Sequence, residues 1–476
     1  MIAPAKKCLS LICAGGLWAA CALAQSPVTL TIGSGADGQA IPDDFIGLSF
    51  GTRVLPPGKS GSHFFSPTNT ALINIFQNLA IRHLRVGGTT VESPPETPIP
   101  NQTDIDNLFA FARAAGVKKI IYSLRLLQTD PARSYAATNA AIAKYIWTHY
   151  QPYLECFALG NEPDRKAIFS RDIAITNFTT YLARWDAMAS AITNAVPGAK
   201  IGGPDADSGN IRWTTNFAES EKKTGLLSIA TEHYYAGGAG KGLDPREGIE
   251  TMLSPGWIKN YQKLYDKMAV PVLSSGVPFR FTEANDHYSG GVREASDTFA
   301  GALWALDFLH WWAAHDTRGV DFHNTQWVVN DVITHDAVGR LMINPKGCGL
   351  KTFDLGAHGN VTPVAISNSG GVNLTAYAVH NGDDFFVTVI NKDHGPVARA
   401  ADITIVSGGM KSAKAMFLTA PASDVTAKTG VTLGGAPISN DSPWRGQWTP
   451  LVSREAGRCA IKLPAASAVV VNISKK

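Results

Sequence analysis

The chain has 476 residues, of which 45% are hydrophobic and 17% charged, and its formal net charge at pH 7 is +3. This composition is that of a folded protein with two or three domains, and it excludes a largely disordered chain. The small net charge argues against a protein that attracts nucleic acid or membranes through its overall charge.

The first 24 residues have the pattern of a secretory signal peptide. A basic pair, Lys6 and Lys7, precedes a mostly apolar stretch at residues 8–23, and Ala22-Leu23-Ala24 supplies a cleavage site after Ala24. We therefore expect a periplasmic or secreted protein with no membrane contact after cleavage. Loss of the two lysines lowers the 42 basic residues to 40 against 39 acidic ones, which leaves a net charge of +1.

A short strand is predicted next, at residues 27–32, before a glycine-rich stretch at residues 33–38. The stretch matches the glycine pattern of dinucleotide-binding proteins, but that pattern must open a helix. Here Pro42 follows and residues 45–50 have the pattern of another strand, so we predict a turn. We expect segment 25–40 to join the sheet of the C-terminal domain.

From residue 45 onward, apolar strands and amphipathic helices alternate eight times. The predicted strands are residues 45–50, 81–86, 117–124, 153–159, 199–203, 226–235, 278–283 and 319–323. The first helix is predicted to start at Ser66-Pro67, and the second to span Thr103–Ala115 with a capping box formed by Thr103 and Asp106. A further helix is expected near residues 249–268. This order predicts a (β/α)₈ TIM barrel over residues 41–350, with an open doubly wound sheet as the alternative.

After residue 350 the helical spacing disappears and Gly, Ser, Thr and Val become frequent. Strands are predicted at residues 374–379, 384–391, 401–406, 413–418 and 466–473. Residues 351–476 are therefore predicted to form a β-sandwich domain. Outside the signal peptide there are three cysteines: Cys156 is expected in the core, and Cys348 and Cys459 could form a disulfide in an oxidising compartment.

Two of the predicted barrel strands lead into a single glutamate. The fourth strand is followed by Gly160-Asn161-Glu162-Pro163, and the seventh ends at Glu283. Catalytic groups of such barrels lie at the carboxyl ends of the strands, so we expect Glu162 and Glu283 to face each other across the mouth. Two facing carboxylates can hydrolyse a glycosidic bond, one as acid and one as nucleophile or base. No metal or organic cofactor is implied.

Several stretches resemble the retaining glycosidases of clan A and, within that clan, glycoside hydrolase family 79, the heparanase and β-glucuronidase family. They are Leu84–Thr89, Gly160–Pro163, His233–Tyr235, Tyr288–Gly291 after Glu283, and Ser296–Ala300. The resemblance spans the barrel and the C-terminal β domain. It implies that Glu162 is the acid/base and Glu283 the nucleophile.

The resemblance also implies roles for neighbouring residues. Asn161 would bind the 2-hydroxyl of the sugar, and Arg85 would contact Glu283 together with a tyrosine of the segment His233–Tyr235. His233 is a candidate substrate-binding residue in the same segment. Tyr234 and Tyr235 point to opposite faces of a regular strand, so at most one of them is expected in the pocket.

The turn Tyr288-Ser289-Gly290-Gly291 would bind a uronate carboxylate through the Tyr288 hydroxyl and the backbone amides around Gly290. Two departures from the family pattern leave the sugar open. Gly51 stands where an acidic residue is common, and the stretch 330–335 carries Asp331 but no tyrosine.

The sequence therefore predicts an exported retaining exo-β-glucuronidase with a carbohydrate substrate. An endo-β-glucuronidase of the heparanase type and a clan A glycosidase for another sugar are alternatives. A carbohydrate-binding protein without activity is the alternative of a different class, and the presence of both glutamates argues against it.

Overall fold

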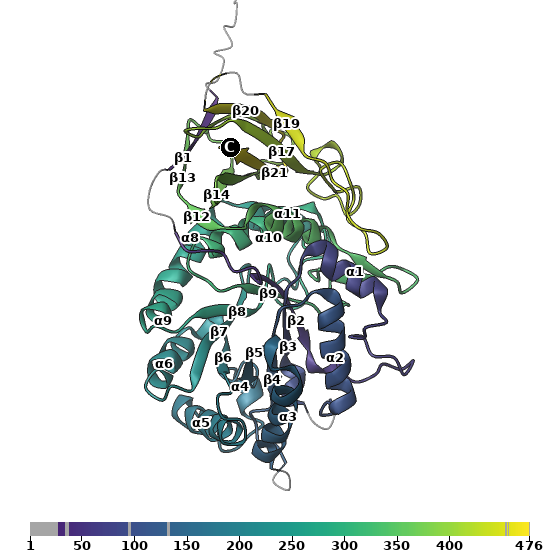
Figure 1. The fold of residues 1–476 in the computed structure, drawn as a ribbon, viewed down its shortest axis with the longest axis vertical. Coiled ribbons are helices and arrows are strands. Elements are labelled where there is room, and N and C mark those ends of the chain that lie inside the picture. The colour runs from purple at the N-terminus through teal and green to yellow at the C-terminus, as the bar shows by residue number, and fades with distance from the viewer. Residues whose placement is uncertain are drawn as a thin grey trace, which may run out of the picture.

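The computed structural model describes residues 27–33, 38–93, 97–130, 134–452, 455 and 457–475. The predicted signal peptide and its cleavage site lie outside these residues. The described chain forms a barrel surrounded by helices, with a layered β domain on one side of it (Figure 1).

Eight parallel strands close into a barrel, in the order of the sequence. They are β2 (Ile46–Gly51), β3 (His83–Gly87), β4 (Lys119–Leu124), β5 (Leu154–Leu159), β6 (Ile201–Asp207), β7 (Leu227–Tyr235), β8 (Phe279–Asn285) and β9 (Val320–His323). The predicted (β/α)₈ barrel is therefore confirmed, and the open doubly wound sheet is excluded. Two strands are longer than predicted: β6 continues past Pro204 to Asp207, and β8 continues two residues past Glu283.

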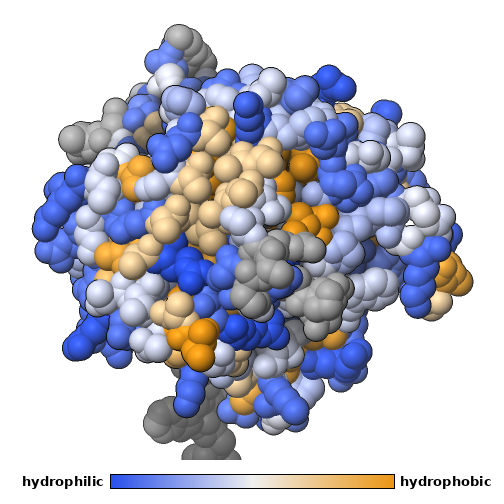
Figure 2. Space-filling view, turned by 90° about the horizontal axis from the view of Figure 1, so that it is seen from below, coloured by the Kyte–Doolittle hydropathy of each residue, from blue (hydrophilic) through white to orange (hydrophobic). Residues whose placement is uncertain are grey.

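Helices surround the barrel and connect it to the β domain. They are α1 (Thr70–Leu79), α2 (Gln102–Ala115), α3 (Tyr135–Tyr150), α4 (Lys166–Phe169), α5 (Phe178–Ala195), α6 (Arg212–Glu221), α7 (Pro245–Leu253), α8 (Gly256–Leu264), α9 (Val270–Ser274), α10 (Phe299–Ala313) and α11 (Pro345–Gly356). On the side of the molecule that faces away from the β domain, the surface is largely hydrophilic around a pale orange central patch (Figure 2). Among the described residues, no helix is both long and apolar enough to cross a bilayer.

Three predicted helix boundaries are wrong. Helix α1 begins at Thr70, because the side chain of Asn69 accepts the cap hydrogen bond from the Leu72 amide. Helix α2 has its capping box two residues earlier than predicted, between Asn101 and Asp104. The predicted helix at 249–268 is interrupted at Ser254, whose extended backbone precedes Pro255, and the chain continues as α8, a π-helical segment and α9.

The end of the barrel opposite the mouth is closed by a buried ionic cluster. His83, at the start of β3, lies 2.6 Å from Asp321 Oδ1 and 2.7 Å from Glu155 Oε2 through its two ring nitrogens. Arg280, at the start of β8, donates from Nε to Asp321 Oδ2 at 3.2 Å. These contacts hold the strands together near their amino ends. The open pocket lies at the other end of the barrel, at the carboxyl ends of the strands.

The C-terminal domain contains two stacked sheets. One has the strand order β13 (Val364–Ser367), β1 (Val28–Ile32), β16 (Ala401–Val406) and β20 (Arg458–Leu463). The other contains β12 (Asn360–Thr362), β14 (Leu374–Asn381), β15 (Asp384–Asn391), β21 (Ser467–Ser474), β17 (Ser412–Thr419) and β18 (Thr432–Leu433), with β19 (Thr449–Leu451) paired to β17. Apolar residues of both sheets share one core, as expected for a sandwich.

Helix α10 lies between the barrel and this domain (Figure 1). All fifteen of its residues are buried, because one side faces the barrel strands and the other packs against α11 and the β domain. Cys348 on α11 belongs to the core around the barrel, whereas Cys459 on β20 belongs to the sandwich core. Both are free thiols, as is Cys156, so the structure does not contain the possible Cys348–Cys459 disulfide.

Candidate active site

The two glutamates reach the barrel mouth from different backbone settings. Glu283 lies within β8, and its register partner on β7 is His233. Glu162 lies in the loop after β5, where its backbone adopts a left-handed conformation with φ 47°. Such a conformation costs a non-glycine residue about 1–3 kcal/mol. The amide of Glu162 donates to the carbonyl of Asp205 at 2.8 Å, which anchors this turn.

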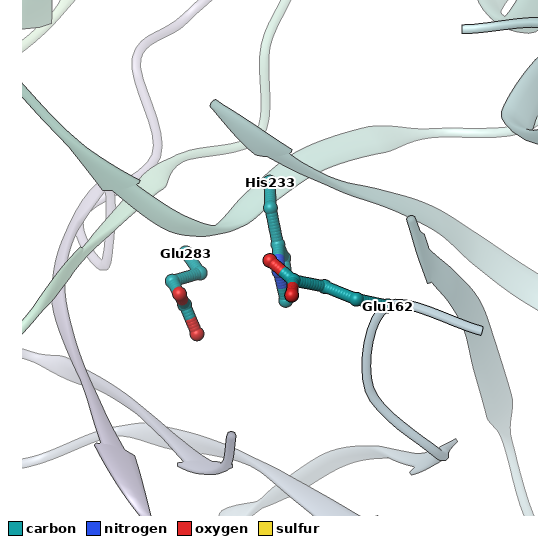
Figure 3. A group of neighbouring side chains, drawn as sticks. All are labelled: Glu162, His233 and Glu283. Atoms are coloured by element: carbon teal, nitrogen blue, oxygen red, sulfur yellow. The ribbon is translucent and has the colours of Figure 1, made fainter. Parts of the chain in front are cut away.

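The side chains of Glu162, His233 and Glu283 point into one space at the mouth (Figure 3). One oxygen of each carboxylate and a ring nitrogen of His233 all lie within 4.8 Å of one another. Glu162 and Glu283 border an open pocket of about 1290 Å³, measured with the solvent space at its mouth, and the buried His233 lies behind them. The lining residues of the pocket are Thr89, Glu162, Arg165, Asp207, Ser208, Gly209, Tyr235, Gly238, Glu283, Tyr288, Ser289 and His323.

Glu283 is held by three groups. The Tyr235 hydroxyl donates to its Oε1 at 2.6 Å, Arg85 Nη1 donates to its Oε2 at 3.1 Å, and His323 Nδ1 lies 3.3 Å from Oε2. Burial raises the pKa of this carboxyl, but the positive charges of His323, His233 and Arg85 more than offset burial and hold the pKa well below its ordinary value. Glu283 is therefore ionised and fixed in direction.

Arg85 lies beneath the mouth and connects strand β8, which carries Glu283, to the loop after β5, which carries Asn161 and Glu162. Its guanidinium donates to Glu283, to Asn161 Oδ1 at 2.8 Å, to Asp205 Oδ2 at 2.8 Å and to Ser49 Oγ at 3.2 Å. The amide of Asn161 is therefore oriented with its oxygen toward Arg85 and its nitrogen 3.5 Å from Thr89 Oγ1. One side chain thus positions Asn161 and Glu283 relative to each other.

Glu162 is held by two cations. His233 Nδ1 lies 3.2 Å from Oε1, and Arg165 Nη1 donates to Oε2 at 2.6 Å. Burial raises the pKa of Glu162, and the negative charge of Glu283 raises it further. The contacts with His233 and Arg165 have the larger combined effect, so the pKa lies below its ordinary value.

The remaining predicted residues divide between the pocket and the core. Tyr235 lies in the pocket, whereas Tyr234 faces outward and stacks on Phe281. Tyr288 is half-exposed and lines the pocket with Ser289. Gly290 adopts φ +90° within this turn and does not line the pocket, and a Cβ at this position would crowd Val328.

Glu162, His233 and Glu283 are spaced closely enough to offer three ligand atoms to a metal ion. However, Arg85 contacts Glu283 and Arg165 contacts Glu162. A metal cation bound to these carboxylates would lie beside two permanent positive charges. The site therefore fits chemistry carried by the two carboxylates.

Sequence reasoning missed Asp205, Arg165 and His323. Asp205 and His323 are polar residues near the carboxyl ends of β6 and β9, which is the signal that identified the glutamates. Asp331, in the stretch that departs from the family pattern, would repel a uronate if it faced the pocket. It is buried and accepts hydrogen bonds from the amides of Thr325 and Val328, so it faces its own loop.

Residues 360–470 match the sequence model of the glycosyl hydrolase family 79 C-terminal beta domain. This match confirms the resemblance to that family and the prediction of a glycoside hydrolase. A comparison with curated protein sequences found no match.

Several solved structures share the whole fold. A 4-O-α-L-rhamnosyl-β-D-glucuronidase from Fusarium oxysporum 12S has a TM-score of 0.74 at 17% identity, covering 93% of this chain and 99% of the other. A GH51 arabinofuranosidase from Xanthomonas axonopodis pv. citri has a TM-score of 0.68 at 13% identity, covering 94% and 100%. A family 44 xyloglucanase from Paenibacillus polymyxa has a TM-score of 0.62 at 12% identity, with the same coverage.

Proposed function

We propose that this glycoside hydrolase, whose C-terminal β domain matches that of family 79, is a retaining exo-β-glucuronidase. It would release terminal β-linked glucuronic acid from glycans or conjugates. The observation that carries this proposal is the pair of buried glutamates facing one pocket, with an oxygen of each within 4.8 Å of the other. The fold shared with a rhamnosyl-glucuronidase supports the choice of sugar.

The reaction would proceed by double displacement. Glu283, kept ionised by its neighbours, attacks the anomeric carbon while Glu162 gives its proton to the departing glycosidic oxygen. Water then attacks the glycosyl ester, and Glu162 takes a proton from that water. Retaining enzymes separate their carboxyl groups by about 5–5.5 Å and inverting ones by about 6.5–9.5 Å. One oxygen of each carboxylate lies within 4.8 Å of the other, which is compatible with the shorter separation of retaining enzymes.

The neighbouring residues would act on this pair and on the sugar. Arg85 and the Tyr235 hydroxyl aim the nucleophile and stabilise its charge before attack. Arg85 fixes the oxygen of Asn161, and the amide nitrogen has two hydrogens. One points toward Thr89 Oγ1, and the other would donate to the 2-hydroxyl of the sugar. This contact would strengthen in the transition state.

The turn beside the pocket would select the uronate. Tyr288 and Ser289 line the pocket, and the left-handed backbone of Ser289, Gly290 and Gly291 makes a tight turn below it. His323 also lines the pocket, and its positive charge would favour an anionic sugar. Asp331 is directed into its own loop, which removes one objection to a negatively charged substrate.

A glycosidase for a neutral sugar is the second candidate. The stretch 330–335 has no tyrosine, and the fold is also shared with a GH51 arabinofuranosidase. An endo-acting glucuronidase remains the alternative for polymeric substrates, because the pocket is open to solvent on one side.

A panel of nitrophenyl glycosides separates these candidates. We expect hydrolysis of the β-glucuronide and little activity on the β-glucoside and α-arabinofuranoside, and proton NMR of the first product should show the β-anomer. Hydrolysis of a neutral glycoside alone would overturn the choice of sugar, and an α-anomeric first product would overturn the mechanism.

Export belongs to the same proposal. The predicted signal peptide would direct the chain out of the cytoplasm, with cleavage after Ala24. N-terminal sequencing of the mature protein should then begin at Gln25, and an uncleaved cytoplasmic product would contradict export.

A further inference from the structure

Each oxygen of the acid/base carboxylate proposed above already has a nitrogen partner. Oε1 of Glu162 lies 3.2 Å from His233 Nδ1, and Oε2 accepts a hydrogen bond from Arg165 Nη1 at 2.6 Å. A proton donor must direct one oxygen at the glycosidic oxygen of the substrate, within hydrogen-bond reach. The protonated oxygen has no charge to hold its nitrogen partner, so we expect one of these two contacts to open when a glycoside binds.

The two partners differ in their freedom to move. The side chain of His233 is 1% exposed, lies on strand β7 and interacts electrostatically with Glu283, Arg85 and Asp205. The side chain of Arg165 is 52% exposed and projects from a loop immediately before the four-residue helix α4. Displacing the histidine would disturb the barrel, whereas rotating the arginine requires only changes in its own side-chain torsions.

We propose that Arg165 is a positioning residue that covers Oε2 of Glu162 in the free enzyme and releases it when the leaving group of a glycoside enters. The inference rests on the acid/base role proposed for Glu162. It assigns Arg165 to the leaving-group side of the pocket, since the acid must stand beside the departing oxygen.

The pocket offers Arg165 a second partner after release. Asp207, at the end of β6, lines the same pocket. The negative charge of Glu162 raises the pKa of Arg165 most, and Asp207 and Asp164 contribute in the same direction. Among the described residues that line the pocket, Arg165 carries the one permanent positive charge, so a leaving group with acceptor oxygens could also take its hydrogen bonds.

The groups that face Glu162 set the sign of the expected pH effect. They are His233 and Tyr235 on β7, Glu283 on β8, Asp164 on the same loop, and Arg165. Arg165 favours the ionised form of Glu162, whereas catalysis begins from the protonated form. Removal of Arg165 should therefore raise the pKa of the acid in the free enzyme and move the alkaline limb of activity to higher pH.

The test compares two pH profiles for wild type and Arg165→Gln. The substrate is an alkyl β-glycoside of whichever sugar the panel identifies, because an alkoxide leaving group needs the proton. The profile of kcat/KM reports the free enzyme, and that of kcat reports the substrate complex. We expect the alkaline limb of kcat/KM to shift upward in Arg165→Gln while the limb of kcat stays in place.

Two variants serve as controls. Lys166→Gln removes the same charge from the adjacent exposed residue, which has no contact with Glu162 in the structure, and should leave both profiles unchanged. Arg165→Lys keeps a charge near Glu162 and should shift the kcat/KM limb less than Arg165→Gln.

Each remaining outcome overturns the proposal. A shift in both profiles would mean that Arg165 stays on Glu162 in the complex, and a shift in neither would mean that the contact does not control the acid. Because the substrate is chosen by the panel, an error in the proposed sugar leaves this test intact. If Glu162 is not the acid, the variant Glu162→Gln should retain its activity, and this result is distinct from the pH profiles of Arg165→Gln.

Discussion

The two sides of the pocket hold their carboxylates in different ways. Glu283 is part of a regular strand and is fixed by a buried arginine and a tyrosine hydroxyl. Glu162 lies on a strained loop, and one of its two partners is a half-exposed arginine. The barrel therefore preorganises the proposed nucleophile, whereas the proposed acid depends on one partner that is free to move.

The largest expected effect comes from Glu283→Gln, on the rigid side. The amide has no charge to form the glycosyl ester, so kcat should fall by about 10⁴-fold or more, a loss typical of removing a catalytic nucleophile. Steady-state kinetics on the best nitrophenyl glycoside measures this loss. Activity near that of wild type would remove Glu283 from the mechanism.

Glu162→Gln, on the adjustable side, should have an effect that depends on the leaving group. General acid catalysis contributes about 10²–10⁴-fold, so formation of the glycosyl ester from an alkyl glycoside should slow by that factor. From a dinitrophenyl glycoside, the dinitrophenolate leaves without needing a proton. The pre-steady-state burst of released dinitrophenolate should therefore remain fast. Equal losses of the first step on both substrates would contradict the acid role.

Tyr235→Phe gives the smallest of the three effects, and Tyr234→Phe is its matched control. A hydrogen bond to a charged group contributes about 1.5–3 kcal/mol, so loss of the 2.6 Å contact with Glu283 should lower kcat/KM by about 10- to 100-fold. Tyr234 packs in the aromatic core, and its substitution should change kcat/KM much less. Similar losses of kcat/KM in the two variants would mean that disturbance of strand β7, and not loss of the Tyr235 hydroxyl, lowers the activity.

The sequence predicted the barrel because each strand is a short apolar run and each run is followed by a helical pattern. It singled out Glu162 and Glu283 because each follows or ends such a run. Asp205 was missed because Pro204 marked the predicted end of the fifth strand, although β6 continues through that proline to Asp207.

The partners of the two glutamates could not be derived in the same way. Arg85 reaches Glu283 across 198 residues of sequence and Asp205 across 120. Such contacts depend on strand register, and a shift of one residue turns every side chain to the other face. Within the segment 233–235, alternation did predict that only one tyrosine could enter the pocket, but it could not say which one.

The burial of α10 has a consequence for how this enzyme could be shortened or recombined. A fragment that ended with the last barrel strand would expose the face of α10 that packs against α11 and the β domain, where Asp307 binds Lys392 and His310 stacks on Tyr377. Moreover, β1 lies ahead of the barrel in sequence yet pairs in parallel with β16 near the other end of the chain. We therefore expect the barrel alone to expose a buried face, although the β domain contributes no residue to the described pocket.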